Sequence, residues 1–274
     1  MKKTFRAVCG IALIAGLLVA MQAPVGADQR CGNDERLSAG NNFSLRNHVW
    51  NAGAAGTGWW QCIWNTPGNQ NSWGFDWDFP DNGFQGVKSF PHIQAGWDFD
   101  GGWVGPRWRS QINAKRPITT SWTVQLNGFS GHFGEGTWDM IYDIWTHPTS
   151  TPGHAWSGHK PSTEIIVMLA RGNTFGGDFG NVAKNISLAG ATWNVHYHWI
   201  DFGNGMAWPL FTFQRTSRTT SVSNLNLMQF IDWLHVRNRI NGNHYVTAVH
   251  AGFEICNGKG SPDTTNWSLN VTSS

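Results

Sequence analysis

Charged residues are scarce in this chain of 274 residues, because Asp, Glu, Lys and Arg make up only 13% of it. The 19 Lys and Arg nearly balance the 17 Asp and Glu, so the formal net charge is +2. A chain without a basic excess lacks the electrostatic footprint of a protein that binds nucleic acid or an anionic membrane. Uncharged polar and aromatic side chains must carry much of the surface, which suits a neutral partner.

Long hydrophobic runs are absent beyond the start of the chain. Residues 2–6 hold three basic residues, residues 8–21 form an apolar run too short to span a membrane, and residues 25–27 are small. This is the pattern of a signal peptide with its cleavage site. We expect residues 1–27 to be removed, the protein to be secreted, and one domain to occupy residues 28–274.

Cysteine is also rare, with four residues in the chain. Cys9 would leave with the signal peptide. In an exported protein, Cys31 and Cys62, which flank the first strands, are expected to form a disulfide. Cys256 then remains as a small buried hydrophobic residue.

Metal-binding motifs, internal repeats and linkers are missing too. The chain has no CxxC or HExxH pattern, and the pair His196 and His198 has no apparent third ligand. We therefore expect no metal and no other cofactor.

Short segments in which apolar and polar residues alternate are frequent, and Gly, Asn and Pro separate them. Examples are residues 121–126, 140–145 and 192–199. Many short strands at such spacing are typical of an all-β sandwich or barrel.

One segment has helical spacing instead. Leu227, Phe230, Ile231 and Leu234 recur as they would on one face of a helix, and Ser223 is a candidate N-cap. A single helix on an all-β chain is expected to pack on the convex side of a sheet.

Two glutamates interrupt apolar strands, Glu164 within residues 163–169 and Glu254 within residues 251–256. A carboxylate in such a strand is costly unless it is paired or lies in a cleft. Two carboxyl groups, one nucleophile or base and one proton donor, are what a glycosidase needs. Because side chains alternate along a strand, Asp143 on a third strand could line the same groove.

Six short motifs that include these residues follow one another along the chain. They are residues 46–51, 73–79, 87–91, 142–145, 164–169 and 252–258. In this order and spacing they resemble glycoside hydrolase family 12, a family of β-glucanases that includes endoglucanases and xyloglucan hydrolases. The resemblance covers nearly all of the expected mature chain.

The resemblance implies a β-jelly-roll sandwich of two curved antiparallel sheets with the helix on the convex side. It implies a retaining endo-β-1,4-glucanase that hydrolyses cellulose-type polysaccharides, mixed-linkage β-glucan or xyloglucan by double displacement. Glu164 would be the nucleophile and Glu254 the acid/base, and Asp143 would hydrogen-bond the nucleophile. We expect a monomer, since nothing in the sequence points to an oligomer.

Substrate contacts follow in part from the resemblance. Trp50 would stack on a sugar, and His48 stands where the family often has a sugar-binding Asn. Met168 replaces a Trp that lines the family's cleft, Ile166 replaces a Met, and Asn51 replaces a Gly. These departures leave both carboxyl groups in place and alter the subsites around them.

Tryptophan is abundant, with 18 residues, and an indole face can stack on the apolar face of a pyranose. Trp77, Trp145 and Trp208 are therefore further candidates for sugar stacking.

Three alternatives stay open. The enzyme could be specific for xyloglucan, or it could be a jelly-roll xylanase, although residues 87–91 favour the glucanase. A non-catalytic β-glucan-binding protein could also use this fold, but binding alone would not require both Glu164 and Glu254.

Overall fold

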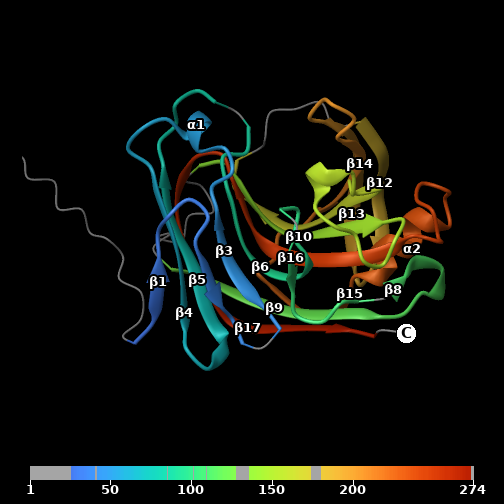
Figure 1. The fold of residues 1–274 in the computed structure, drawn as a ribbon, viewed down its shortest axis with the longest axis horizontal. Helices are drawn as coiled ribbons and strands as arrows, with labels where there is room; N and C mark the ends of the chain where they lie inside the picture. Colours follow the sequence, from blue (N-terminus) through green and yellow to red (C-terminus); the bar gives the residue numbers. More distant parts are fainter. Residues whose placement is uncertain are drawn as a thin grey trace, which may run out of the picture.

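The computed structural model describes residues 26–272 except 41, 85, 101, 109, 128–135 and 174–179. Two β-sheets stack face to face, as Figure 1 shows, and both are curved. The expected signal peptide lies, up to residue 25, outside the described residues.

The smaller sheet has six strands, and the larger sheet has eleven. The smaller sheet contains, in spatial order, β1 (Asp28–Arg30), β4 (Trp60–Thr66), β5 (Asn69–Phe79), β17 (Gly258–Val271), β9 (Ile118–Asn127) and β15 (Ser221–Asn226). The larger sheet contains β12 (Gly180–Leu188), β13 (Ala191–Asp201), β14 (Ala207–Arg215), β11 (Thr163–Arg171), β10 (Trp138–His147), β16 (Tyr245–Ile255), β6 (Phe90–Trp97), β3 (Ser44–His48) and β2 (Arg36–Ser38). Two short strands extend it, β7 (Trp103–Val104) beside β6 and β8 (Ser110–Gln111) beside β16.

Helices are short and few in the described ranges. They are α1 (Ala52–Ala55), α2 (Met228–His235) and the 3-10 turns η1 (Ile112–Ala114) and η2 (Ala155–Ser157). None of them is long and apolar enough to cross a membrane.

The expected sandwich of two curved sheets is confirmed, with one departure from antiparallel order. Every described strand pairing is antiparallel except that of β11 with β14, which is parallel. Parallel neighbours need a long connection, and here β12 and β13 supply it.

Alternation along β11 decides which residues enter the core. Ile165, Val167 and Leu169 are buried between the two sheets. Glu164 and Met168 lie on the opposite, concave face and are partly exposed. The predicted division of this strand into a core face and a groove face is confirmed.

Tryptophans fill much of the space between the sheets. The fully buried ones in this core are Trp73, Trp77, Trp122, Trp138, Trp193 and Trp267. Trp97 is also fully buried, but it packs with Trp145 and Trp208 in a separate cluster. Trp77 belongs to the smaller sheet and packs 5.5 Å from Phe253, ring centre to ring centre. Its predicted role in sugar stacking is therefore wrong, because its ring is 1% exposed.

Helix α2 begins at Met228 rather than after Ser223. Residues 221–226 pair with β9 as strand β15, so Ser223 cannot act as the N-cap. The side-chain oxygen of Asn226 instead accepts a hydrogen bond of 3.1 Å from the backbone N–H of Met228.

The apolar face of α2 packs on the convex side of the larger sheet, as expected. Phe230 contacts Trp193 at 4.8 Å and Phe213 at 5.1 Å between ring centres. Phe213 lies directly opposite Val167, so both point away from the face that carries Glu164.

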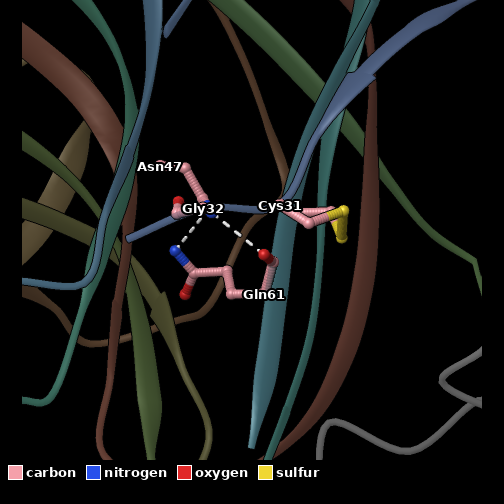
Figure 2. The surroundings of a disulfide bond; sticks show 5 residues. Cys31, Gly32, Asn47 and Gln61 are labelled. Carbon is pink, nitrogen blue, oxygen red and sulfur yellow. Dashed lines mark hydrogen bonds between the residues drawn. A yellow bond between two sulfur atoms is a disulfide. The ribbon is translucent and has the colours of Figure 1, made fainter. Parts of the chain in front are cut away.

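The predicted disulfide between Cys31 and Cys62 is confirmed. It joins the residue after β1 to β4, and polar contacts surround it (Figure 2). The amide of Asn47 donates to the carbonyl oxygens of Gly32, at 2.7 Å, and of Gln61, at 2.9 Å. Gln61 donates back to the side-chain oxygen of Asn47 at 2.7 Å. The segment that follows β1 is thus held to the sandwich by the disulfide and by the hydrogen bond from Asn47 to Gly32.

We expect replacement of both Cys31 and Cys62 by Ser to lower the free energy of unfolding by about 3–4 kcal/mol, because the bond closes a loop with a sequence separation of 31. Urea unfolding measures the change. Reduction of the wild-type protein should reproduce it, and reductant should leave the variant unchanged. A difference below about 1 kcal/mol would show that the link does not constrain the unfolded chain.

Candidate active site

Carboxyl groups from three neighbouring strands lie on the concave face of the larger sheet. Glu164 on β11 is directly opposite Trp145 on β10, and Glu254 on β16 is directly opposite Asp139 on β10. Asp143 lies between these two positions on β10. Because directly opposite residues point to the same side of a sheet, all four carboxyl groups share one face.

The side chain of Glu164 is held by an indole. Trp208 on β14 donates a hydrogen bond of 2.7 Å from Nε1 to Oε2 of Glu164. Burial raises the pKa of Glu164 to about 7, and this hydrogen bond opposes the shift because it favours the ionised form.

Asp143 has its own indole partner. Trp145 donates from Nε1 to Oδ2 of Asp143 at 2.8 Å. Burial and the charges of Glu164 and Glu254 raise the pKa of Asp143 well above its usual range. Among the described hydrogen bonds none joins Asp143 to Glu164, so the expected direct bond is not formed and the two groups interact through their charges.

The pKa of Glu254 is raised in the same way. Burial and the negative charge of Glu164 raise the pKa of Glu254 to about 8. An apolar strip formed by Ile141, Ile166 and Leu210 lies on this face and removes water from it. Glu254 therefore keeps its proton to higher pH than Glu164 does.

Asp139 is a fourth carboxyl group that the sequence reasoning did not select. It is 1% exposed, and burial together with the charge of Glu254 raises its pKa well above the usual range. The sequence could have identified Asp139, because alternation along β10 places it on the same face as Asp143.

Trp145 and Trp208 do not offer a face to a sugar. They are 8% and 2% exposed, and Phe99 covers them at 5.8 Å and 5.7 Å between ring centres. Their predicted stacking role is wrong because neighbouring aromatic rings occupy those faces. Their indole N–H groups hold the carboxyl groups of Asp143 and Glu164 instead.

Trp50 and Met168 lie on opposite sides of Glu254, Trp50 after β3 and Met168 on β11, the strand that also carries Glu164. Trp50 lies two residues after the end of β3 and is 48% exposed, so its ring is available for contact. Met168 lies opposite Ile141 on one side and Gln214 on the other and is partly exposed. Both positions suit a contact with a bound chain.

His48 is uncharged at the end of β3. Burial, with the charge of Arg46, lowers the pKa of His48 to about 4. Its ring meets His92 edge to face at 5.8 Å, and burial also lowers the pKa of His92 well below its usual range. These imidazoles supply neutral polar groups to the β3 side of the face.

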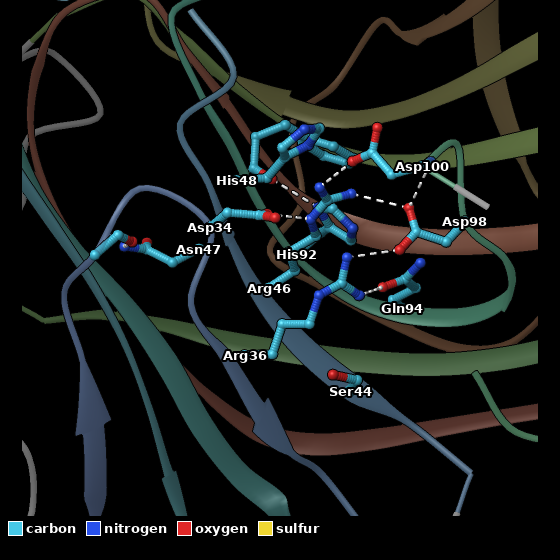
Figure 3. A network of polar contacts seen from close by, with 12 residues as sticks. Asp34, Arg36, Ser44, Arg46, Asn47, His48, His92, Gln94, Asp98 and Asp100 are labelled. Carbon is cyan, nitrogen blue, oxygen red and sulfur yellow. Dashed lines mark hydrogen bonds and ion pairs between the residues drawn. The ribbon is translucent and has the colours of Figure 1, made fainter. Parts of the chain in front are cut away.

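Arg46 is the centre of an ion-pair network beside these histidines (Figure 3). It is 3% exposed and contacts Asp34 at 2.5 Å, Asp98 at 2.9 Å and Asp100. Burial alone would raise the pKa of Asp98, but Arg46 and Arg36 lower it to about 2. The sequence carried no signal for this network, because Asp34 lies between β1 and β2 whereas Asp98 and Asp100 lie far along the chain between β6 and β7.

No group of three or more His, Cys, Asp or Glu within the described ranges is arranged to hold a metal ion.

Related proteins and solved structures indicate one family for this chain. No protein-family model matches the chain. Endoglucanase S of Pectobacterium parmentieri is 31% identical over 251 residues, which cover 90% of this chain and 89% of that protein. Xyloglucan-specific endo-beta-1,4-glucanase A of Emericella nidulans is 26% identical over 232 residues, 82% of each chain. The solved family 12 xyloglucanase of Bacillus licheniformis has a TM-score of 0.77 and 28% identity, covering 89% of this chain and 100% of that one.

Trp208→Phe is expected to raise the pKa of Glu164 further, by about 1–2 units, because the hydrogen bond that stabilises its carboxylate is lost. Carboxyl ¹³C NMR of protein with labelled Glu measures this directly, since the chain contains only four Glu. Trp145→Phe is the matched control, because its indole serves Asp143. An unchanged Glu164 titration in Trp208→Phe would rule out this role of the indole.

Proposed function

The chain belongs to glycoside hydrolase family 12, and from this membership we propose that it cleaves internal β-1,4-glucosidic bonds of a β-glucan with retention at the anomeric carbon. It is a glycoside hydrolase with the endo-β-1,4-glucanase activity of its relatives. The observation that carries the mechanism is the pair Glu164 and Glu254, which lie on one face with β10 between them and differ in pKa.

The first step forms a covalent intermediate. An oxygen of ionised Glu164 attacks the anomeric carbon while Glu254 gives its proton to the glycosidic oxygen. The bond between that carbon and oxygen breaks, and an ester to Glu164 forms. Trp208 keeps the attacking carboxylate oriented through its 2.7 Å hydrogen bond.

The second step releases the sugar. Glu254, now ionised, takes a proton from water as the water attacks the anomeric carbon and the ester to Glu164 breaks. Glu254 thereby regains its proton for the next cycle. Because burial favours the protonated form of Asp143, this third carboxyl group adds little repulsion when Glu164 or Glu254 is charged.

The glucan would run across the strands of the concave face. Trp50 follows β3 on one side of Glu254, and Met168 on β11 lies on the other side. The neutral ring of His48 suits hydroxyl groups of a sugar, and exposed Trp50 suits its apolar face. Cellulose-type chains, mixed-linkage β-glucan and xyloglucan are the proposed substrates, and residues 1–27 are proposed to direct secretion.

Glu164→Ala and Glu254→Ala are expected to lower kcat by at least about 10²–10⁴-fold on barley β-glucan and xyloglucan, since each removes one partner of the double displacement. Azide rescue distinguishes the nucleophile from the acid/base. Each variant is incubated with azide and an aryl β-cellotrioside that has a good leaving group. The Glu164 variant should yield the α-glycosyl azide, and the Glu254 variant the β-glycosyl azide, as read by ¹H NMR. Wild-type release of the α-anomer as first product would refute retention.

The activity should depend on pH as a bell centred between pH 7 and 8. Below about 7 Glu164 takes up a proton and cannot attack, because burial raises its pKa. Above about 8 Glu254 loses the proton that it must donate. Initial rates of β-glucan hydrolysis from pH 4 to 10 measure both limbs. A maximum below pH 5 would contradict the raised pKa of Glu164.

A further inference from the structure

Two large aromatic side chains beyond the carboxyl groups are exposed to solvent and lie next to each other. Trp156 in η2 is 55% exposed, and Phe202, which directly follows β13, is 53% exposed. Their ring centres are 6.3 Å apart. Neighbouring exposed rings of this size are typical of a surface that binds a partner.

Ring contacts connect this pair to Glu164. The ring centre of Phe202 lies 5.6 Å from that of Trp208. Trp156 lies 5.8 Å from Phe99, and Phe99 lies 5.7 Å from Trp208. Trp208 is 2% exposed and donates the hydrogen bond that holds Glu164. These four rings form an aromatic wall that begins at the proposed nucleophile and ends at the surface.

The aromatic wall lies at one end of the strands. Glu164 and Trp208 are the second residues of the parallel strands β11 and β14. Trp156 belongs to the connection from β10 to β11, and Phe202 belongs to the turn from β13 to β14, so both come from that same end. A glucan that runs across the strands of the concave face, as proposed, would therefore have the wall along its flank.

Hydrogen bonds fix the segment that carries Trp156. On one side of it, Nε1 of Trp97 donates to the carbonyl oxygen of Gly153 at 2.8 Å. On the other side, Nζ of Lys160 donates to the carbonyl oxygen of Gly205 at 2.9 Å, which joins the segment to the turn between β13 and β14. The exposed rings are thus held in position before a partner arrives, and this lowers the entropic cost of binding.

The chemistry of the wall favours a neutral sugar as the partner. The apolar C–H face of a pyranose can stack on an aromatic ring, and Trp156 and Phe202 offer two such rings. None of the described ion pairs includes a residue of 152–160 or 200–208, so a charged ligand finds no ionic anchor there. Because Trp208 separates Glu164 from the exposed rings, the sugar that meets them is one attached to the side of the backbone.

We propose that Trp156 and Phe202 bind a branch sugar of the glucan, so that the enzyme prefers xyloglucan, whose backbone carries xylosyl branches, to unbranched β-glucan. This inference rests on the proposed function, because the backbone must occupy the cleft beside Glu164. The aromatic wall then selects the substrate and leaves the double displacement to Glu164 and Glu254.

The test compares tamarind xyloglucan with barley β-glucan as substrates. Trp156→Ala combined with Phe202→Ala should lower the ratio of kcat/KM on xyloglucan to kcat/KM on barley β-glucan about tenfold, because stacking on the branch is lost. Trp199→Ala is the matched control and should leave this ratio within about twofold. Trp199 is 51% exposed, but alternation along β13 places it on the side of Trp193, which packs against α2.

Binding supplies a second readout that does not need turnover. In the Glu164→Gln background, isothermal titration compares cellotetraose with the xyloglucan oligosaccharide built on the same backbone. Loss of both exposed rings should weaken binding of the branched ligand about tenfold and that of cellotetraose less than about twofold. Circular dichroism confirms that each variant is folded. Trp156→Phe with Phe202→Tyr should keep most of the preference, because the rings remain.

An unchanged kcat/KM ratio in the double variant, or an equal loss of affinity for both oligosaccharides, would overturn the branch site while leaving the glucanase intact. Absence of wild-type hydrolysis on both polymers would instead refute the proposed function, and the titration would still decide whether the aromatic wall binds branched chains.

Discussion

The crowding of four carboxyl groups on one face of the larger sheet is the constraint on which the site depends. Asp139 and Asp143 are buried and Glu164 and Glu254 are partly buried among apolar side chains, where a charge is costly. Burial therefore favours protons on all four, and indole hydrogen bonds oppose it at Glu164, from Trp208, and at Asp143, from Trp145. Of the two glutamates, only Glu164 receives one among the described hydrogen bonds. In the proposed mechanism, this difference lets Glu164 ionise to act as the nucleophile while Glu254 keeps its proton to act as the acid.

Trp145 and Trp208 show that burial in the fold decides which part of a tryptophan side chain is used at the site. An abundance of Trp in a glycosidase suggests sugar stacking, yet Trp145 and Trp208 are covered by Phe99 and use their N–H groups. Their rings exclude water from the carboxyl groups that they contact. Trp50 is exposed, so its ring remains available for the proposed contact with a sugar.

The two sides of the concave face differ in electrostatics although the chain as a whole is nearly neutral. Arg46 is surrounded by aspartates near β2 and β3, and the uncharged ring of His48 lies beside it. Arg171 on the opposite side forms no ion pair within the described structure, although Asp139 lies directly opposite it. A nearly neutral total charge therefore coexists with a local difference in charge between the two sides.

Alternation of side chains along a strand was enough to place Glu164 on a groove face. The expected export of the protein was enough to predict the disulfide between Cys31 and Cys62. Both inferences follow from local geometry or chemistry. The sequence by itself thus determined the sandwich, its helix and the identity of two glutamates. Tertiary structure alone decided the partners of Arg46 and the indole contacts of Glu164. Those contacts join residues far apart in the chain, and no local pattern specifies which strands become neighbours or which rings are covered.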